Sequence, residues 1–98
     1  MALNIRVKLF GDVATVANST SLEVGLGGDA RLSDLLVALD AATGRLVSQT
    51  ITDSDGRLLP SIAVLVNGSN VFLKQGLETS LAEGDTVSVM PLMGGGGQ

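Results

Sequence analysis

The C-terminal end of the chain carries the residues with the most distinctive chemistry. Four consecutive glycines, Gly94 to Gly97, follow Pro91-Leu92-Met93 and precede Gln98. Fixing a run of glycines costs much backbone entropy, so we expect residues 93–98 to form a flexible arm. An arm without Cβ atoms can enter a narrow channel and present its carboxylate to chemistry at the far end. On composition alone, a disordered terminus or an expression remnant is the simpler interpretation.

The side chains that most often perform acid–base or nucleophilic catalysis are missing from the sequence. Its 98 residues include no histidine and no cysteine. This composition removes the usual general base near neutral pH, the imidazole and thiolate metal ligands, and any Ser-His or Cys-His pair. It also removes disulfides, so the chain must fold by packing alone.

Two short patterns suggest other ligands, and both are weak. Gly25-Leu26-Gly27-Gly28-Asp29-Ala30 has the G-x-G-x-x-A spacing of a dinucleotide fingerprint. A Rossmann unit needs a parallel strand after the helix, whereas a polar loop and hairpin signals follow here. Asp53-Ser54-Asp55-Gly56 hints at a calcium loop, but its glycine comes too early and the later ligands are missing. A glycine-rich turn and an acidic surface turn are the better interpretations.

Length and charge limit the kind of protein. A chain of 98 residues with 45% apolar side chains and two phenylalanines predicts one small domain with an aliphatic core. The net charge of −4 and six scattered basic residues argue against nucleic acid or an anionic membrane as partner. No apolar stretch approaches the roughly 20 residues of a membrane span, and the N-terminus lacks a signal-peptide layout. We therefore expect a cytoplasmic protein.

Alternating apolar residues and a β-branched run predict a set of strands. The predicted strands are Leu3–Phe10, Thr20–Leu26, Ile62–Val66, a short Asn70–Leu73 and Thr86–Met90. Gly11-Asp12 is expected to be a turn, and Asn67-Gly68 is the strongest two-residue hairpin signal in the chain. Pro91 is expected to end the last strand.

One segment has helical spacing. Within Leu32–Ala42, the apolar positions Leu32, Leu35, Leu36 and Leu39 share one face. Ser33 or Asp29 is expected to cap its start and Gly44 its end. Residues 48–60 are polar and rich in turn formers, so we expect a loop there.

The order of elements predicts the architecture. One helix packed across a mixed sheet makes a two-layer α+β domain. The first and last strands must be neighbours, because each has one apolar face and the chain is too short for two cores. This layout is the β-grasp, with residues 1–92 as the domain and residues 93–98 as the tail.

The chain resembles the sulfur-carrier branch of the ubiquitin-like proteins. That branch includes the small subunit of molybdopterin synthase, the thiamine sulfur carrier, the cysteine-biosynthesis carrier and the archaeal small modifier proteins. The matching positions are Leu3–Phe10, Asp34-Leu35-Leu36, Ile62–Gly68, Leu77, Leu81, Glu83–Val87, Met90–Met93 and the glycines. No single motif is strong, but their order and spacing together are fairly specific.

The resemblance implies a mechanism in which this chain is a carrier and not an enzyme. A ubiquitin-activating-type adenylyltransferase would bind the chain and ATP, and the terminal glycine carboxylate would form an acyl-adenylate. Sulfur from a persulfide would then displace AMP and leave a thiocarboxylate. A sulfur-acceptor synthase subunit would receive the sulfur, with molybdopterin biosynthesis as the favoured pathway. The chain itself would bind no cofactor, since ATP and any zinc belong to the partner.

The chain departs from that family at its last residues. Family members usually end at Gly-Gly, whereas this sequence continues to Gln98. Counting five residues from Pro91 makes Gly96 the reactive residue, and trimming Gln98 alone would make it Gly97. Both remain open, with Gly94 and Gly95 as the rest of the tail. The resemblance therefore implies a processing protease as a further partner.

A docking surface is the last expectation. Phe10, Leu65 and Met90 fall on the exposed face of the predicted sheet as a small apolar patch, together with Ala63, Ser88 and the basic Arg6 and Lys8. The patch either lies under a loop or helix end or binds a partner, and the resemblance favours the partner. Two other functions stay open: a protein modifier conjugated to lysines, and a non-catalytic β-grasp binding module.

Overall fold

The computed structural model describes residues 2–71 and 74–92. Its strands form a mixed sheet in the order β2-β1-β5-β3-β4. The strands are β1 (Ala2–Leu9), β2 (Ser21–Gly27), β3 (Ile62–Val66), β4 (Ser69–Asn70) and β5 (Thr86–Pro91). The helices are α1 (Gly11–Ala17) and α2 (Leu32–Thr43), with short 3-10 helices η1 (Val47–Thr50) and η3 (Gly76–Glu78).

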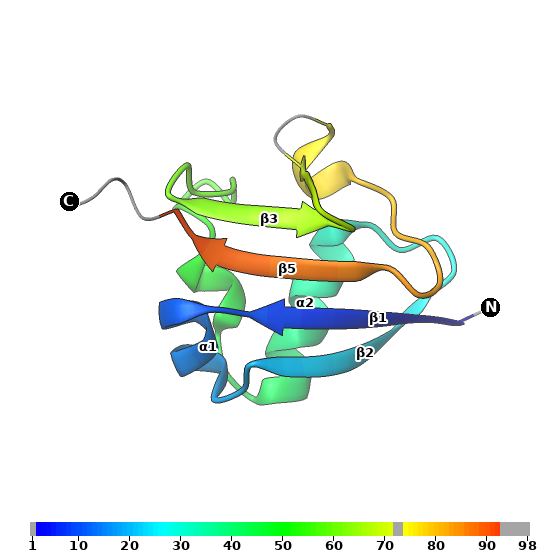
Figure 1. Ribbon diagram of the computed structural model, residues 1–98, viewed down its shortest axis with the longest axis horizontal. Coiled ribbons are helices and arrows are strands. Elements are labelled where there is room, and N and C mark those ends of the chain that lie inside the picture. The colour runs from blue at the N-terminus through cyan, green and yellow to red at the C-terminus, as the bar shows by residue number, and fades with distance from the viewer. Residues whose placement is uncertain (1, 72–73, 93–98) are drawn as a thin grey trace.

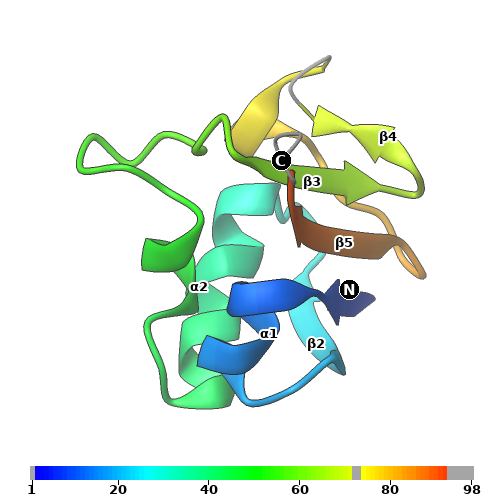
Figure 2. The same cartoon turned by 60° about the vertical axis from the view of Figure 1, so that its left-hand side comes forward.

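Strands from the two ends of the chain meet at the centre of the sheet. β1 pairs in parallel with β5, which places Val7 beside Val87 and Leu9 beside Val89. β1 also pairs antiparallel with β2, and β5 with β3. Both helices lie on the same side of the sheet (Figures 1 and 2). The predicted α+β β-grasp architecture is therefore confirmed, whereas the boundary after residue 92 stays a prediction because residues 93–98 lie outside the described residues.

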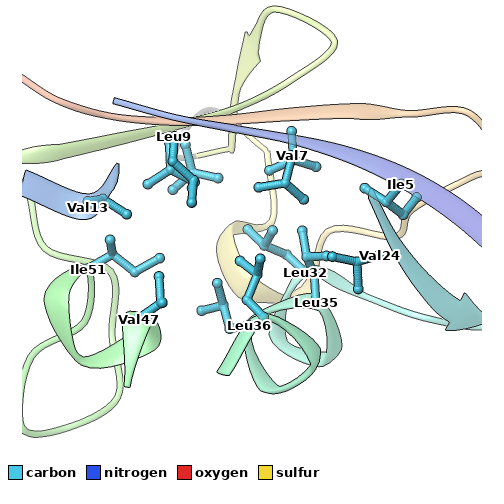
Figure 3. Packing of buried hydrophobic residues seen from close by; sticks show 14 of the residues in the cluster. Ile5, Val7, Leu9, Val13, Val24, Leu32, Leu35, Leu36, Val47 and Ile51 are labelled. Carbon is cyan, nitrogen blue, oxygen red and sulfur yellow. The ribbon is translucent and has the colours of Figure 1, made fainter. Parts of the chain in front are cut away.

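The core is aliphatic, as the composition predicts. Alternate residues of β1 point their side chains toward α2, where they pack against a stripe of leucines (Figure 3). The side chains that are almost completely buried include Ile5, Val7, Leu9, Leu32, Leu35, Leu39, Val64, Val87 and Val89. Burying one such side chain is worth about 1.5–3 kcal/mol, so this layer supplies much of the stability.

The expected turn at Gly11-Asp12 is wrong, because a short helix starts there. Gly11 has φ +63°, which turns the chain sharply after β1, and α1 then runs to Ala17. Val13 and Ala17, four residues apart, are buried against the core. Asn18, with φ 55°, ends the helix in the left-handed conformation. Tertiary burial of one face stabilises this helix of seven residues.

Helix α2 begins and ends near its predicted boundaries, but its start is capped differently. The N-cap is Arg31, rather than Ser33 or Asp29. The carboxylate of Asp34 accepts a hydrogen bond from the backbone N–H of Arg31 at 2.8 Å, as an acidic residue does in a capping box. Gly44 ends the helix with φ +69°, as predicted.

The segment expected to be a loop at residues 48–60 contributes to the core. It overlaps η1 and contains the buried Ile51 and Leu58, while Val47 just before it is fully buried. Thr50 and Thr52 donate their hydroxyls to the backbone carbonyls of Val47 and Ser48, which satisfies polar groups that would otherwise be left without partners. A polar sequence therefore covers one end of the core through isolated apolar residues.

Two smaller boundaries also change. The hairpin at Asn67-Gly68 is confirmed, but its second strand is only Ser69–Asn70, and residues 72–73 lie outside the described residues. Pro91 is the last residue of β5 rather than the one after it. The amide of Asn67 joins this hairpin to the turn before β5, since it donates to Asp85 at 2.9 Å. No helix within residues 2–71 and 74–92 is long and apolar enough to span a bilayer.

The packing predicts a large difference between two positions on α2. Leu35→Ala removes a side chain that is 0% exposed and should destabilise the fold by about 2–5 kcal/mol through the cavity it leaves. Val37→Ala is the matched control, because Val37 is 70% exposed on the same helix. Urea unfolding followed by circular dichroism measures both. Equal midpoints for the two variants would contradict this packing.

Candidate functional site

Strand β5 leads from the centre of the sheet toward the glycines. It is hydrogen-bonded to β1 on one side and β3 on the other. Its last residues lie at the end of the sheet where α1 begins, opposite the N-terminus (Figure 1). Gly94, Gly95, Gly96 and Gly97 follow this strand, but they lie outside the described residues, so their roles stay predictions.

The structure brings the predicted docking residues onto the sheet face that is remote from the helices. Phe10 follows β1 and is 45% exposed. Its backbone N–H donates to the carbonyl of Val89 at 3.0 Å, which sets Phe10 beside Met90. Leu65 is diagonal to Met90, because Leu65 pairs with Ser88. Leu65 and Met90 are half-buried, so Phe10 is the most exposed of the three.

One residue on this face is misplaced by sequence reasoning and another is missed. Ala63 is on the expected face, opposite Met90, but it is only 3% exposed and is not part of an accessible surface. Leu92 is 51% exposed and has the same alternation as Met90. That alternation was the signal that could have found it. We call Phe10, Leu65, Met90 and Leu92 the apolar corner.

A hollow of about 400 Å³ lies beside Phe10. Its lining residues are Lys8, Leu9, Phe10, Gly11, Ala14, Thr20 and Ser21. Lys8 has no ion-pair partner within residues 2–71 and 74–92. Arg6, by contrast, pairs with Glu23 at 3.3 Å. The rim of the hollow therefore offers an unneutralised ammonium group next to an apolar surface.

Pro91 and Leu92, the last described residues, are held by contacts on both sides. Leu92 donates its backbone N–H to the carbonyl of Ser61 at 2.7 Å, which extends the pairing of β3 and β5 by one bond. On the other side, the ring of Pro91 lies against Gly11, where a Cβ atom would be 2.8 Å from the proline Cγ. The last described residues are thus fixed by contacts from two different segments.

The alternative ligand sites do not form. The Gly25–Ala30 segment follows an antiparallel strand pair, so it has no Rossmann topology. At the acidic turn, the carboxylate of Asp53 accepts backbone N–H bonds from Asp55 and Arg57 at 2.8 and 3.0 Å, which is a local turn. Over residues 2–71 and 74–92, no group of three or more carboxylates could hold a metal ion.

The fold defines a class, the small ubiquitin-like β-grasp proteins. The profile of the ThiS family matches residues 7–96, and the chain belongs to that family. It is 39% identical over 89 residues to small archaeal modifier protein 1 of Haloferax volcanii, covering 91% of this chain and 97% of that one. It is 40% identical over 65 residues to a protein of Archaeoglobus fulgidus named as a sulfur carrier, covering 66% and 73%.

A solved structure agrees with this assignment. The crystal structure of small archaeal modifier protein 1 from Haloferax volcanii superposes with a TM-score of 0.79 at 34% identity, covering 95% of this chain and 99% of that chain. The expected family is therefore confirmed. Relatives named as carrier and as modifier both match, which leaves the choice between these two functions open.

The site geometry predicts that an aspartate introduced at either of two positions on one sheet face has very different effects on stability. Phe10→Asp should leave the melting temperature nearly unchanged, because its side chain is 45% exposed. Ala63→Asp should destabilise strongly, since an isolated carboxylate at a position that is 3% exposed loses its hydration. Calorimetric melting of both variants tests this. A stable Ala63→Asp variant would mean that position 63 is accessible and belongs to the corner.

Proposed function

We propose that this chain is a sulfur carrier whose C-terminal glycine, Gly96 or Gly97, is the reacting residue. A ubiquitin-activating-type partner binds the apolar corner and ATP together. A carboxylate oxygen of the glycine attacks the α-phosphorus of ATP, pyrophosphate leaves, and an acyl-adenylate forms. A persulfide sulfur then attacks the acyl carbon and AMP leaves. A second thiolate of the sulfur donor then attacks the donor's own sulfur in the resulting acyl disulfide, so the S–S bond breaks, the thiocarboxylate leaves and the donor is oxidised to a disulfide.

One observation carries this proposal: along the chain, the central strand β5 leads through residues of an exposed apolar surface to the glycines. Met90 and Leu92 belong to the corner and Gly94 is two residues further on. Five residues beyond Leu92 can span at most about 18 Å when extended. For the reaction to occur, a partner that holds the corner must therefore have its ATP site within about that distance of Leu92.

The corner also indicates the chemistry of its partner. Phe10 and Leu92 offer exposed apolar contacts, and such anchors dominate binding when they are desolvated. Lys8 stands at the rim without an ion-pair partner within the part of the chain that the structure describes. We infer a complementary partner surface with an apolar side chain for the hollow and a carboxylate facing Lys8.

The remaining steps of the proposed function would be carried out by other partners. A synthase subunit would accept the sulfur, with molybdopterin biosynthesis as the favoured pathway, and a protease would remove Gln98 to expose a glycine carboxylate. ATP and any zinc would be bound by the partners, in the cytoplasm. This assignment is supported by the family, in which one matching relative is named as a sulfur carrier.

The second candidate is a ubiquitin-like protein modifier. The similarity to small archaeal modifier protein 1, at 39% identity over 89 residues, favours it specifically. In this case the same adenylate is passed to a lysine amine of a target, and AMP leaves as an isopeptide bond forms. The products separate the two functions: a thiocarboxylate on the free chain, or conjugates of higher mass in cells.

Docking through the corner predicts a loss of binding without a loss of fold. Phe10→Asp should weaken binding to the activating partner by about tenfold or more, because it puts a charge into a desolvated interface. Val37→Asp is the control, since Val37 is exposed on α2, in the other layer of the domain. Titration calorimetry gives both dissociation constants. Equal affinities for the two variants would place the docking surface elsewhere.

Lys8 predicts an effect on association rate. Lys8→Glu should slow binding and reverse the sign of its salt dependence, because a rim charge acts mainly by steering the encounter. Stopped-flow association at two ionic strengths measures this. An unchanged rate at low salt would show that the partner has no carboxylate opposite Lys8.

Processing of the tail is the prediction that tests the chemistry itself. The chain truncated after Gly96 or after Gly97 should be adenylated much faster than the chain that retains Gln98, because the glutamine side chain adds bulk at the reacting end. Pyrophosphate exchange into ATP measures adenylation, and intact mass spectrometry detects the replacement of one oxygen by sulfur. If full-length and truncated chains exchange equally well, the precursor hypothesis fails.

A further inference from the structure

Gly11 and Pro91 touch where the chain leaves the sheet. A Cβ atom on Gly11 would lie 2.8 Å from Cγ of Pro91, closer than real Cβ atoms approach, and 3.1 Å from Cδ, which is a tight contact. The proline ring is bonded to its own backbone at both ends, so it cannot rotate away as a long side chain would. Only glycine at position 11 lets the ring occupy its observed place.

The hydrogen-bond pattern explains why a proline stands there. Along β5, odd-numbered residues bond to β1 and even-numbered residues to β3, as shown by Phe10 N–H to the Val89 carbonyl and Leu92 N–H to the Ser61 carbonyl. The nitrogen of residue 91 therefore faces the side where β1 has already turned into α1. Proline has no N–H, so the ladder ends without an unsatisfied donor.

These contacts leave little freedom to the last described residues. Pro91 has a fixed φ and is pressed against Gly11 on one side. Leu92 is hydrogen-bonded to Ser61 at 2.7 Å on the other. A shift of the ring would disturb the bond between Leu92 and Ser61, because Leu92 directly follows Pro91 and the fixed φ of the proline limits how the backbone can compensate.

We propose that Gly11 is a positioning residue that sets the direction in which the chain leaves the domain after Leu92. It acts through Pro91: the absence of a side chain on Gly11 allows the ring to close against the start of α1. This inference rests on the proposed function, because direction matters only if the chain end must reach a partner's reaction centre. The inference adds that the direction in which the chain end leaves the domain can change separately from the affinity of the corner for its partner.

Controls within the chain separate this steric role from backbone strain. Gly44 has φ +69°, close to the +63° of Gly11, but a Cβ there would meet no atom within 4 Å. Gly44→Ala therefore reports the cost of a positive φ alone. Gly25→Ala adds a Cβ in open space at a position without a positive φ and reports neither effect.

The first experiment measures adenylation of these variants by the activating partner. For Gly11→Ala, kcat should fall by about tenfold to a hundredfold, with a smaller rise in KM for the chain, because most of the corner still docks while the changed exit direction brings the carboxylate to the reaction centre less often. Gly44→Ala and Gly25→Ala should retain both constants. A Gly11→Ala variant with normal kcat, or with a raised KM alone, would overturn the proposal.

A double-mutant cycle tests whether the effect passes through the ring. Pro91→Ala removes the Cγ and Cδ atoms that the new Cβ would strike. Gly11→Ala should therefore have little further effect in the Pro91→Ala background, although Pro91→Ala alone lowers kcat by loosening the exit. Additive losses in the double variant would show that Gly11 acts by another route.

A measurement without any partner keeps this inference separate from the proposed function. The chain has no cysteine, so Gln98→Cys can be labelled with a nitroxide at one position. The paramagnetic broadening of backbone amides should move to a different set of residues in the Gly11→Ala variant and stay in place in the Gly44→Ala control. If the chain without these substitutions is not adenylated either at full length or truncated after Gly96 or Gly97, the proposed function fails and this profile alone tests the inference. An unchanged profile in Gly11→Ala overturns the inference.

Discussion

The parallel pairing of β1 with β5 is the interaction on which the other features depend. It joins Leu9 to Val89, residues from opposite ends of the chain, and both side chains are buried against the helices. Because β1 must turn away immediately afterwards, Phe10 is left beside Met90 on the outer face and Gly11 against Pro91. The apolar corner and the fixed exit of the chain are thus consequences of one core pairing.

The fold could be predicted where a pattern is long enough to specify both an element and its buried face. Alternation over β1 and the leucine spacing of α2 meet that condition, and Asn67-Gly68 specifies its own turn. Helix α1 does not, because only Val13 and Ala17 mark its buried face. The burial of Ile51 depends on contacts with distant elements, which no local pattern reveals.

For the site, too, the sequence predicts which face a side chain lies on but not what covers or contacts it. Alternation placed Phe10 and Met90 on one face, and it contained the same signal for Leu92. It could not show that Ala63 is covered, because alternation gives the direction of a side chain and not what lies over it. The contact between Gly11 and Pro91 could not be predicted from the sequence either, since it joins residues eighty positions apart and depends on the shape of the proline ring.

Under the proposed function, in which the chain delivers its own end to a partner, a rigid exit has a thermodynamic advantage. Ordering one residue of backbone costs about 1–2 kcal/mol, and a partner must supply that free energy for every residue it threads. Pairing of Leu92 with Ser61 and the fixed φ of Pro91 have already ordered the chain up to the corner. Only the segment after Leu92, which the sequence predicts to be flexible, then remains to be ordered on binding. A short tether between the docking surface and the reacting carboxylate also keeps their effective concentration high, so weak docking is enough to commit the chain to reaction.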